Sequence, residues 1–299
     1  MSANGFLYFP GCSLRATGAA YEESLLELFR VLAIPLTELD DWNCCGATSY
    51  MAVDEGSAFL LSSRNLSIAA EMGGHEIMAP CAACYLVLRK TLDYVEHYPE
   101  IRAKVEAGLR AAELKAFTGV KVRHPLEILY NEVGVKALKQ KTTRKWKGGK
   151  IACYYGCQAV RPYDEVDRPH NPMRMDELMN AAGAPTIDYA LKTKCCGGSL
   201  TGTIHEVGVN LNEILLREAV RKGAGCIVTI CPLCQFNLDT YQGEMRARGV
   251  AIDIPVLYFT QVLAWALGGD IGKIGLKRSI SGRAAIEKWF SSEEAPAYA

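Results

Sequence analysis

Ten of the twelve cysteines in this 299-residue chain form two sets of five that share one order. Each set begins with a cysteine that follows a glycine. A Cys-Cys-Gly triplet comes after 31 or 37 intervening residues, and a Cys-x-x-Cys pair after 35 or 34 more. The sets are Cys12, Cys44, Cys45, Cys81, Cys84 and Cys157, Cys195, Cys196, Cys231, Cys234. Equivalent cysteines lie 145 to 151 residues apart, which indicates that one unit has been duplicated.

The segments between the cysteines repeat as well. Short apolar runs, typical of buried strands, come before the single cysteine and before the Cys-x-x-Cys pair of each set, at 6–9, 76–79, 151–155 and 226–230. Apolar residues at helical spacing predict helices at 21–32, 58–72, 175–182 and 209–222. This alternation predicts an α/β fold of two pseudo-repeat, Rossmann-like halves with parallel sheets. The predicted domains are 1–145 and 146–299, the second carrying a C-terminal tail.

Each cysteine group is expected at the carboxyl ends of its strands, where parallel α/β folds build their sites. A structural zinc ion or a cubane four-iron cluster takes four ligands, so either would leave one thiolate of each set unused. A cluster opened beyond the cubane would use all five, with one thiolate of the adjacent pair bridging two irons. Neighbouring side chains on a strand point to opposite faces, so the adjacent cysteines converge only if the chain turns there. The glycine after each pair permits that turn.

Composition narrows the function classes. The chain has 33 basic and 33 acidic residues, so no net field favours nucleic acid or an anionic membrane. The longest apolar stretch, 254–267, is shorter than the roughly 20 residues that span a bilayer. Without a signal-peptide pattern the protein is expected in the cytoplasm, where cysteines serve metals or thiol chemistry rather than disulfides. No Walker or dinucleotide-binding motif is present, so no flavin or nicotinamide is expected on this chain.

Over residues 6 to about 268, the doubled pattern resembles the cysteine-rich Cys-Cys-Gly domain of the family formed by the B subunits of heterodisulfide reductases. The resemblance implies an oxidoreductase acting on sulfur groups, with a noncubane [4Fe-4S] cluster held by the five cysteines of each half. It implies reduction of the mixed disulfide of coenzymes M and B or, as in similar bacterial proteins, oxidation of sulfane sulfur, with a lipoate-binding protein as carrier. The implied partners are an HdrC-like iron–sulfur protein and an HdrA-like flavoprotein.

Two further functions stay open: a subunit that relays electrons without touching substrate, and, less favoured, a zinc-stabilised scaffold. Tyr154 and a position near Tyr258 depart from the family, whose methanogen members carry histidine there, and tyrosine is a poorer acid at neutral pH. Tyr154 and His124 are the candidate catalytic residues, and the favoured alternative for His124 is a structural histidine with satisfied hydrogen bonds.

The remaining features have plainer interpretations. Cys153 and Cys226 have no counterpart in the first half and are expected to be small buried apolar residues, a mobile thiol being the alternative. The stretch 136–150 holds seven Lys or Arg residues and no acid, which fits a solvated linker or a docking patch for an acidic partner. The tail 277–299, with Trp289 and Phe290, is expected to form a surface helix against a partner, the alternative being a disordered tail.

Overall fold

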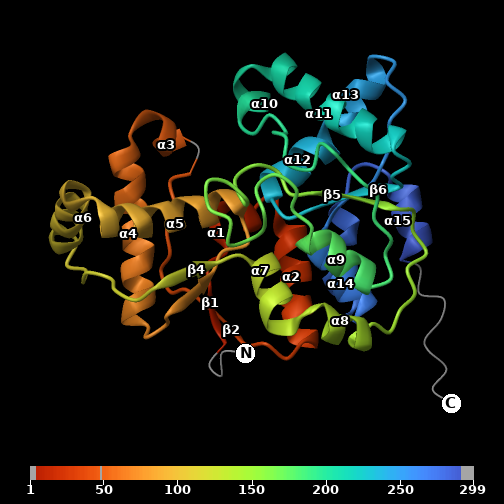
Figure 1. Ribbon diagram of the computed structural model, residues 1–299. Coiled ribbons are helices and arrows are strands. Elements are labelled where there is room, and N and C mark those ends of the chain that lie inside the picture. The colour runs from red at the N-terminus through yellow and green to blue at the C-terminus, as the bar shows by residue number, and fades with distance from the viewer. Residues whose placement is uncertain (1–4, 48, 291–299) are drawn as a thin grey trace.

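The computed structural model describes residues 5–47 and 49–290 and contains two parallel sheets (Figure 1). The first has the order β2 (Leu36–Glu38), β1 (Phe6–Tyr8), β3 (Glu76–Met78), β4 (Lys121–Arg123). The second has the order β5 (Ile151–Tyr154), β6 (Cys226–Thr229), β7 (Val256–Tyr258). β1, β5, β6 and β7 are buried throughout, as expected when helices cover both faces of a parallel sheet. The predicted α/β class and parallel pairing are confirmed.

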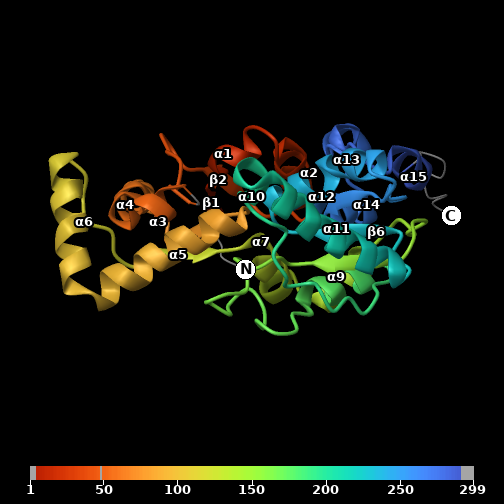
Figure 2. The same cartoon turned by 90° about the horizontal axis from the view of Figure 1, so that it is seen from above.

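Helices alternate with the strands in the first half. They are α1 (Gly11–Leu14), α2 (Ala19–Val31), α3 (Ser49–Val53), α4 (Glu55–Glu71), α5 (Ala82–His97), α6 (Pro99–Ala111), α7 (Pro125–Ile128), the π-helical turn η1 (Leu129–Val133) and α8 (Val135–Lys141). α5 runs outward and α6 projects at the far end of the molecule (Figure 2). This arm distinguishes the two repeats, because the helices that follow the Cys-x-x-Cys pair are shorter in the described second half.

The second half repeats the alternation of strands and helices. Its helices are α9 (Arg174–Ala181), α10 (Leu200–Thr203), α11 (His205–Arg221), α12 (Pro232–Thr240), α13 (Gln242–Ala247), α14 (Phe259–Ala266), the 3-10 turns η2 (Ile271–Lys273) and η3 (Leu276–Arg278), and α15 (Arg283–Trp289). The counterpart of β2 is reduced to one bridge between Ile151 and Thr186. Within the described part of the chain, no helix is long and apolar enough to cross a membrane.

The two halves pack closely against each other and share a core. α14 of the second half packs along α2 of the first, while α7 and α8 of the first half pack against α9 of the second. A buried hydrogen bond of 2.6 Å joins Ser24 to Thr260 across the α2–α14 contact. One continuous hydrophobic core therefore includes residues of both sheets. The domain boundary near residue 145 stays a prediction.

The two aromatic residues of the tail pack against the rest of the chain. Trp289 and Phe290 pack on Trp146, with ring centroids 5.7 Å apart in each pair, and Phe290 also meets Trp265 at 5.5 Å. Only 4% of Phe290 is exposed. Trp146, from within the basic stretch, covers Phe290 and leaves Trp289 half-buried. The expected helix is present as α15, and its contact with a partner stays a prediction. Residues 291–299 lie outside the described part.

Candidate metal centres

Each single cysteine is brought to its group by the glycine in front of it. Gly11 and Gly156 have φ of +68° and +71°, a backbone region that favours glycine. A Cβ on Gly11 would lie 2.9 Å from Cys84 Sγ, and one on Gly156 would lie 3.1 Å from Cys234 Sγ. The glycine therefore provides the turn and also the space for the last thiol of the same set.

The glycine that ends each Cys-Cys-Gly triplet acts in the same way. Gly46 and Gly197 have φ of +77° and +88°. A Cβ there would lie 3.1 Å from the Cα of Ala58 or 3.0 Å from the Cα of Gly208, both on the helix that follows. The predicted turn is confirmed. It brings the triplet into close contact with α4 in one half and with α11 in the other.

In the first half the five predicted cysteines come together. The Sγ atoms of Cys12 and Cys44 are 3.9 Å apart, and those of Cys45 and Cys84 are 3.2 Å apart. Cys44 also contacts Cys45, and Cys81 contacts Cys84, so the five thiols are linked pairwise. Cys12 and Cys44 are exposed while the other three are buried. The group thus extends from the surface into the core.

The second half shows a similar arrangement, with its contacts in two sets, Cys157 with Cys195 and Cys196 with Cys234 and Cys231. The Sγ atoms of Cys196 and Cys234 are 3.5 Å apart, Cys157 contacts Cys195, and Cys231 contacts Cys234. Cys195 is exposed and Cys157 half-buried, while the other three are buried. Both sets therefore offer a surface edge and a buried edge.

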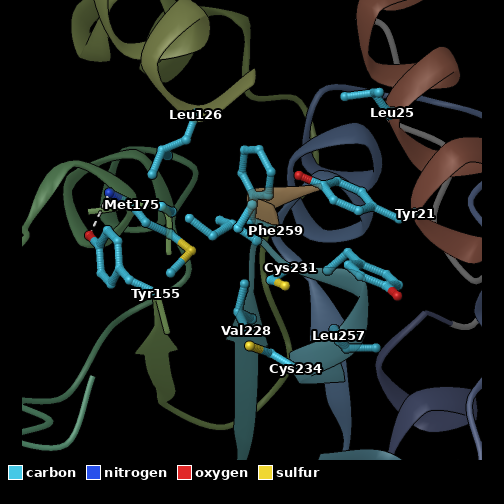
Figure 3. Packing of buried hydrophobic residues seen from close by; sticks show 14 of the residues in the cluster. Tyr21, Leu25, Leu126, Tyr155, Met175, Val228, Cys231, Cys234, Leu257 and Phe259 are labelled. Atoms are coloured by element: carbon cyan, nitrogen blue, oxygen red, sulfur yellow. Dashed lines mark hydrogen bonds between the residues drawn. The ribbon is translucent and has the colours of Figure 1, made fainter. Parts of the chain in front are cut away.

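The buried edges of the two groups meet at Cys81 and Cys231, which lie close enough for each thiol to shift the pKa of the other. The rings of Tyr21 and Tyr258, both fully buried, stack beside them with centroids 4.5 Å apart and planes 10° apart. Figure 3 shows Cys231 below the rings of Phe259 and Tyr21. Sequence reasoning missed this contact between the groups, because it depends on the packing of α14 on α2.

At the surface edge of each group, thiol contacts and backbone N–H groups favour a thiolate at one cysteine and raise the pKa of its neighbour, Cys12 or Cys157. Hydrogen bonds from Cys12 and then Cys45 lower the pKa of Cys44 to about 2, and a hydrogen bond from Cys157 lowers the pKa of Cys195 to about 6. The thiolate is the form of cysteine that binds metals. Over residues 5–47 and 49–290, no three His, Cys, Asp or Glu side chains converge as they would around a single ion. A line of paired thiols suits a polynuclear sulfur-ligated cluster.

His124 is fully buried next to Pro80, close to where Cys81 and Cys231 bring the two groups together. Its Nε2 lies 2.9 Å from the carbonyl of Pro80, and its Nδ1 accepts a hydrogen bond from the backbone N–H of Leu126. Burial lowers the pKa of His124 to about 4, so the ring is neutral at pH 7 and Nε2 is the donor. His124 thereby holds the residue before Cys81, and a catalytic role stays a prediction.

Tyr154, the other candidate catalytic residue, is buried beside the second group. Its hydroxyl donates a hydrogen bond of 2.6 Å to the carbonyl of Lys194, directly before Cys195. Burial raises the pKa of Tyr154 well above its usual value. This contact orients the backbone next to the Cys-Cys-Gly triplet, whereas a catalytic role stays a prediction.

Cys153 and Cys226 are fully buried on β5 and β6, as expected for small apolar strand residues. Burial raises the pKa of both thiols, which keeps them protonated. A cavity of about 1070 Å³ lies between α5, α6 and β4, and no cysteine lines it. The cysteine groups, not this cavity, are the candidate site.

Comparison with protein families matches the CCG cysteine-rich domain twice, over residues 6–89 and 151–239. The chain belongs to this family. A protein of Archaeoglobus profundus, named as similar to the B subunit of heterodisulfide reductase, is 31% identical over 89% of this chain and 91% of its own length. The B subunit of the ferredoxin/F(420)H(2)-dependent CoB-CoM heterodisulfide reductase of Methanosarcina acetivorans is 29% identical over 91% and 92%. The resemblance noted from the cysteines is confirmed.

A relative from a different complex is comparably similar. The 8-methylmenaquinol:fumarate reductase membrane anchor subunit of Wolinella succinogenes is 27% identical over 92% of this chain and 96% of its own length. Among solved structures, a hypothetical protein from Helicobacter pylori aligns with a TM-score of 0.69 at 12% identity, over 94% of this chain. The chain spans about half, 52%, of that protein, and the likeness shows the fold alone. Proteins similar to this chain thus serve more than one redox complex.

Proposed function

We propose that each five-cysteine group holds a noncubane [4Fe-4S] cluster and that the chain is the redox subunit of a heterodisulfide-reductase-like complex. Its reaction is the cleavage or formation of a disulfide or persulfide bond, in heterodisulfide reduction or in sulfane-sulfur oxidation. The clusters would supply one electron each, and cleavage of an S–S bond needs two. The observation that supports this proposal is the contact of Cys81 with Cys231, since it brings the two groups together.

We assign different roles to the exposed edge and the buried edge of each cysteine group. The exposed thiols of Cys44 and Cys195 mark the edge that a sulfur substrate or a partner protein reaches from outside. The buried edge, enclosed by Tyr21, Tyr258 and His124, excludes water from the region between the groups.

Other proteins would carry electrons to or from this chain. The relatives from Methanosarcina and Wolinella are themselves named as subunits of reductases. We therefore propose an iron–sulfur protein and a flavoprotein as partners in the cytoplasm, with the substrate free or carried on a lipoate-binding protein. The basic stretch 136–150 remains a candidate docking patch for an acidic partner.

An electron-relay subunit without substrate contact is the second candidate function. Two observations favour it: the Tyr21–Tyr258 stack covers the junction of the groups, and the Wolinella relative is named for a fumarate reductase. A relay needs only that electrons pass between the clusters, which the Cys81–Cys231 contact provides.

Iron analysis and a spectroscopic titration separate these functions. Anaerobically purified protein should contain about eight irons per chain, whereas two zinc ions and little iron would support the scaffold instead. Adding a disulfide to the reduced, iron-loaded protein should then change its EPR spectrum if substrate sulfur reaches a cluster. An unchanged spectrum, with electrons still exchanged with a partner, would favour the relay.

A further inference from the structure

The duplication gives each cysteine group the same set of backbone donors to sulfur. Gly46 and Gly197 donate N–H groups to the first cysteine of each triplet, and Ala47 and Gly198 donate to the second. In each Cys-x-x-Cys pair the N–H of the second cysteine donates to the first thiol. Hydrogen bonds to sulfur are one of the factors that set the potential of an iron–sulfur cluster. The two halves therefore start from a matched set of backbone donors.

Asn237 adds a side-chain donor in the second half. Its Nδ2 lies 3.6 Å from Cys196 Sγ, 3.3 Å from the carbonyl of Cys196 and 2.9 Å from that of Gly198. Two carbonyl acceptors on one side, and the hydroxyl of Thr201 3.2 Å from Oδ1 on the other, fix the orientation of the amide. Asn237 is fully buried, so water does not compete for its N–H groups.

The first half has no such donor at the equivalent position. Cys84 and Cys234 are equivalent, and three residues further along α5 and α12 stand Val87 and Asn237. Val87 is also buried, with 3% exposed, and has no polar group in its side chain. The repeat therefore contains its own comparison: one group with the amide and one without.

We infer that Asn237 is a positioning residue that raises the reduction potential of the second cluster through its N–H bond to Cys196. The inference rests on the proposed clusters. A reduced cluster carries one more negative charge, so a donor to its thiolate stabilises the reduced form more than the oxidised form. A hydrogen bond to a charged group in a buried site changes the one-electron equilibrium by about threefold to tenfold, which is about 30 to 60 mV at roughly 59 mV per decade.

Exposure to solvent also affects the reduction potentials: it raises that of the first cluster, whereas Asn237 raises that of the second. The variants in the test leave this exposure unchanged. Cys12 is exposed whereas Cys157 is half-buried, and water at Cys12 favours the reduced form of the first cluster. Substitutions at Asn237 and Val87 leave both of these cysteines unchanged. Each variant therefore compares the clusters with the exposure of Cys12 and Cys157 unchanged.

The test is a potentiometric titration of the iron-loaded protein, followed by EPR, in wild type, Asn237→Leu, Val87→Asn and Thr201→Val. Asn237→Leu should lower the reduction potential of the second cluster, which means an equilibrium constant for its reduction that is about threefold to tenfold smaller, the size expected for one hydrogen bond. The potential of the first cluster should stay unchanged. Val87→Asn should raise that of the first. Thr201→Val keeps the donor to sulfur but removes a contact that orients it, so it should lower the potential of the second cluster by less than Asn237→Leu does and leave the first unchanged.

An unchanged potential in Asn237→Leu, with full iron content, would overturn the inference. If Asn237→Leu loses half of its iron, Val87→Asn decides, and an unshifted first cluster there is the negative result. A wild-type protein that binds no iron at all would refute the proposed clusters themselves, which separates the two failures.

Discussion

The glycine before each single cysteine shows how one residue can constrain a whole group. Gly156 has φ of +71° and leaves room for Cys234 Sγ, so a side chain there has both a backbone and a steric cost. Gly183 has a similar φ of +76°, yet a Cβ there would meet nothing within 4 Å. The chain thus offers a control that separates the two costs.

Gly156→Ala should reduce the iron bound at the second group and destabilise the fold by more than the roughly 1 kcal/mol expected from backbone strain alone. Gly183→Ala should show only that strain and keep its iron. Iron analysis and denaturant unfolding measure both effects. Equal behaviour of the two variants would mean that the space beside Cys234 is unimportant.

Cysteine substitutions test which thiols are ligands. Cys196→Ser should lose or rearrange the second cluster, with iron falling from about eight to about four per chain. Cys153→Ala should keep all of its iron and lose only about 1 kcal/mol of packing, because Cys153 is fully buried on β5. Iron loss in Cys153→Ala would show that a different five cysteines bind the cluster.

At the scale of elements, a buried ion pair supports the approach to Cys157. Lys192 Nζ lies 3.0 Å from Asp176 Oδ1, with 5% and 1% of the two side chains exposed. The other oxygen of Asp176 accepts a hydrogen bond of 2.7 Å from the Tyr155 hydroxyl. The carbonyl of Lys192 accepts the N–H groups of Tyr155 and Gly156 at 2.9 and 3.1 Å. Together these contacts fix the end of β5 against α9.

Lys192→Met should destabilise the protein by about 3 to 5 kcal/mol, because it leaves the carboxylate of Asp176 buried without its cation. Burial already raises the pKa of Asp176, so the unpaired carboxyl should take up a proton more readily still. The double variant Lys192→Met, Asp176→Leu should recover most of the loss, since apolar residues often replace a buried pair without cost. Denaturant unfolding of both variants checks this, and a surface-like loss below about 1 kcal/mol would contradict it.

The local elements followed from the sequence because their causes are local. Apolar runs predicted the strands before each group, and helical spacing predicted α2, α4, α9 and α11. Cys153 and Cys226 were predicted to be buried because strand cysteines without partners behave as small apolar residues. The packing of the tail has a nonlocal cause and was not predicted: Trp146, far away in the sequence, contacts Trp289 and Phe290.

At the scale of the whole molecule, the packing of helices of one half on helices of the other places the two cysteine groups against each other. α14 lies on α2, so Tyr258 stacks on Tyr21 beside Cys231 and Cys81. No periodicity in one repeat encodes that contact, because it arises from the fit of two repeats. The convergence of five cysteines in each half could be predicted from the sequence, whereas the distance between the two groups required the packed molecule.

That proximity predicts magnetic coupling between the proposed clusters. When both are reduced to paramagnetic states, wild-type protein should give a broadened or split EPR signal, because Cys81 and Cys231 are in contact. Cys196→Ser, with only the first cluster intact, should give a simple signal without the splitting. Ser24→Ala, which removes the buried hydrogen bond to Thr260 but no ligand, should keep the coupling and controls for a general loosening of α2 on α14. A fully reduced wild type with two uncoupled signals would contradict the junction at Cys81 and Cys231.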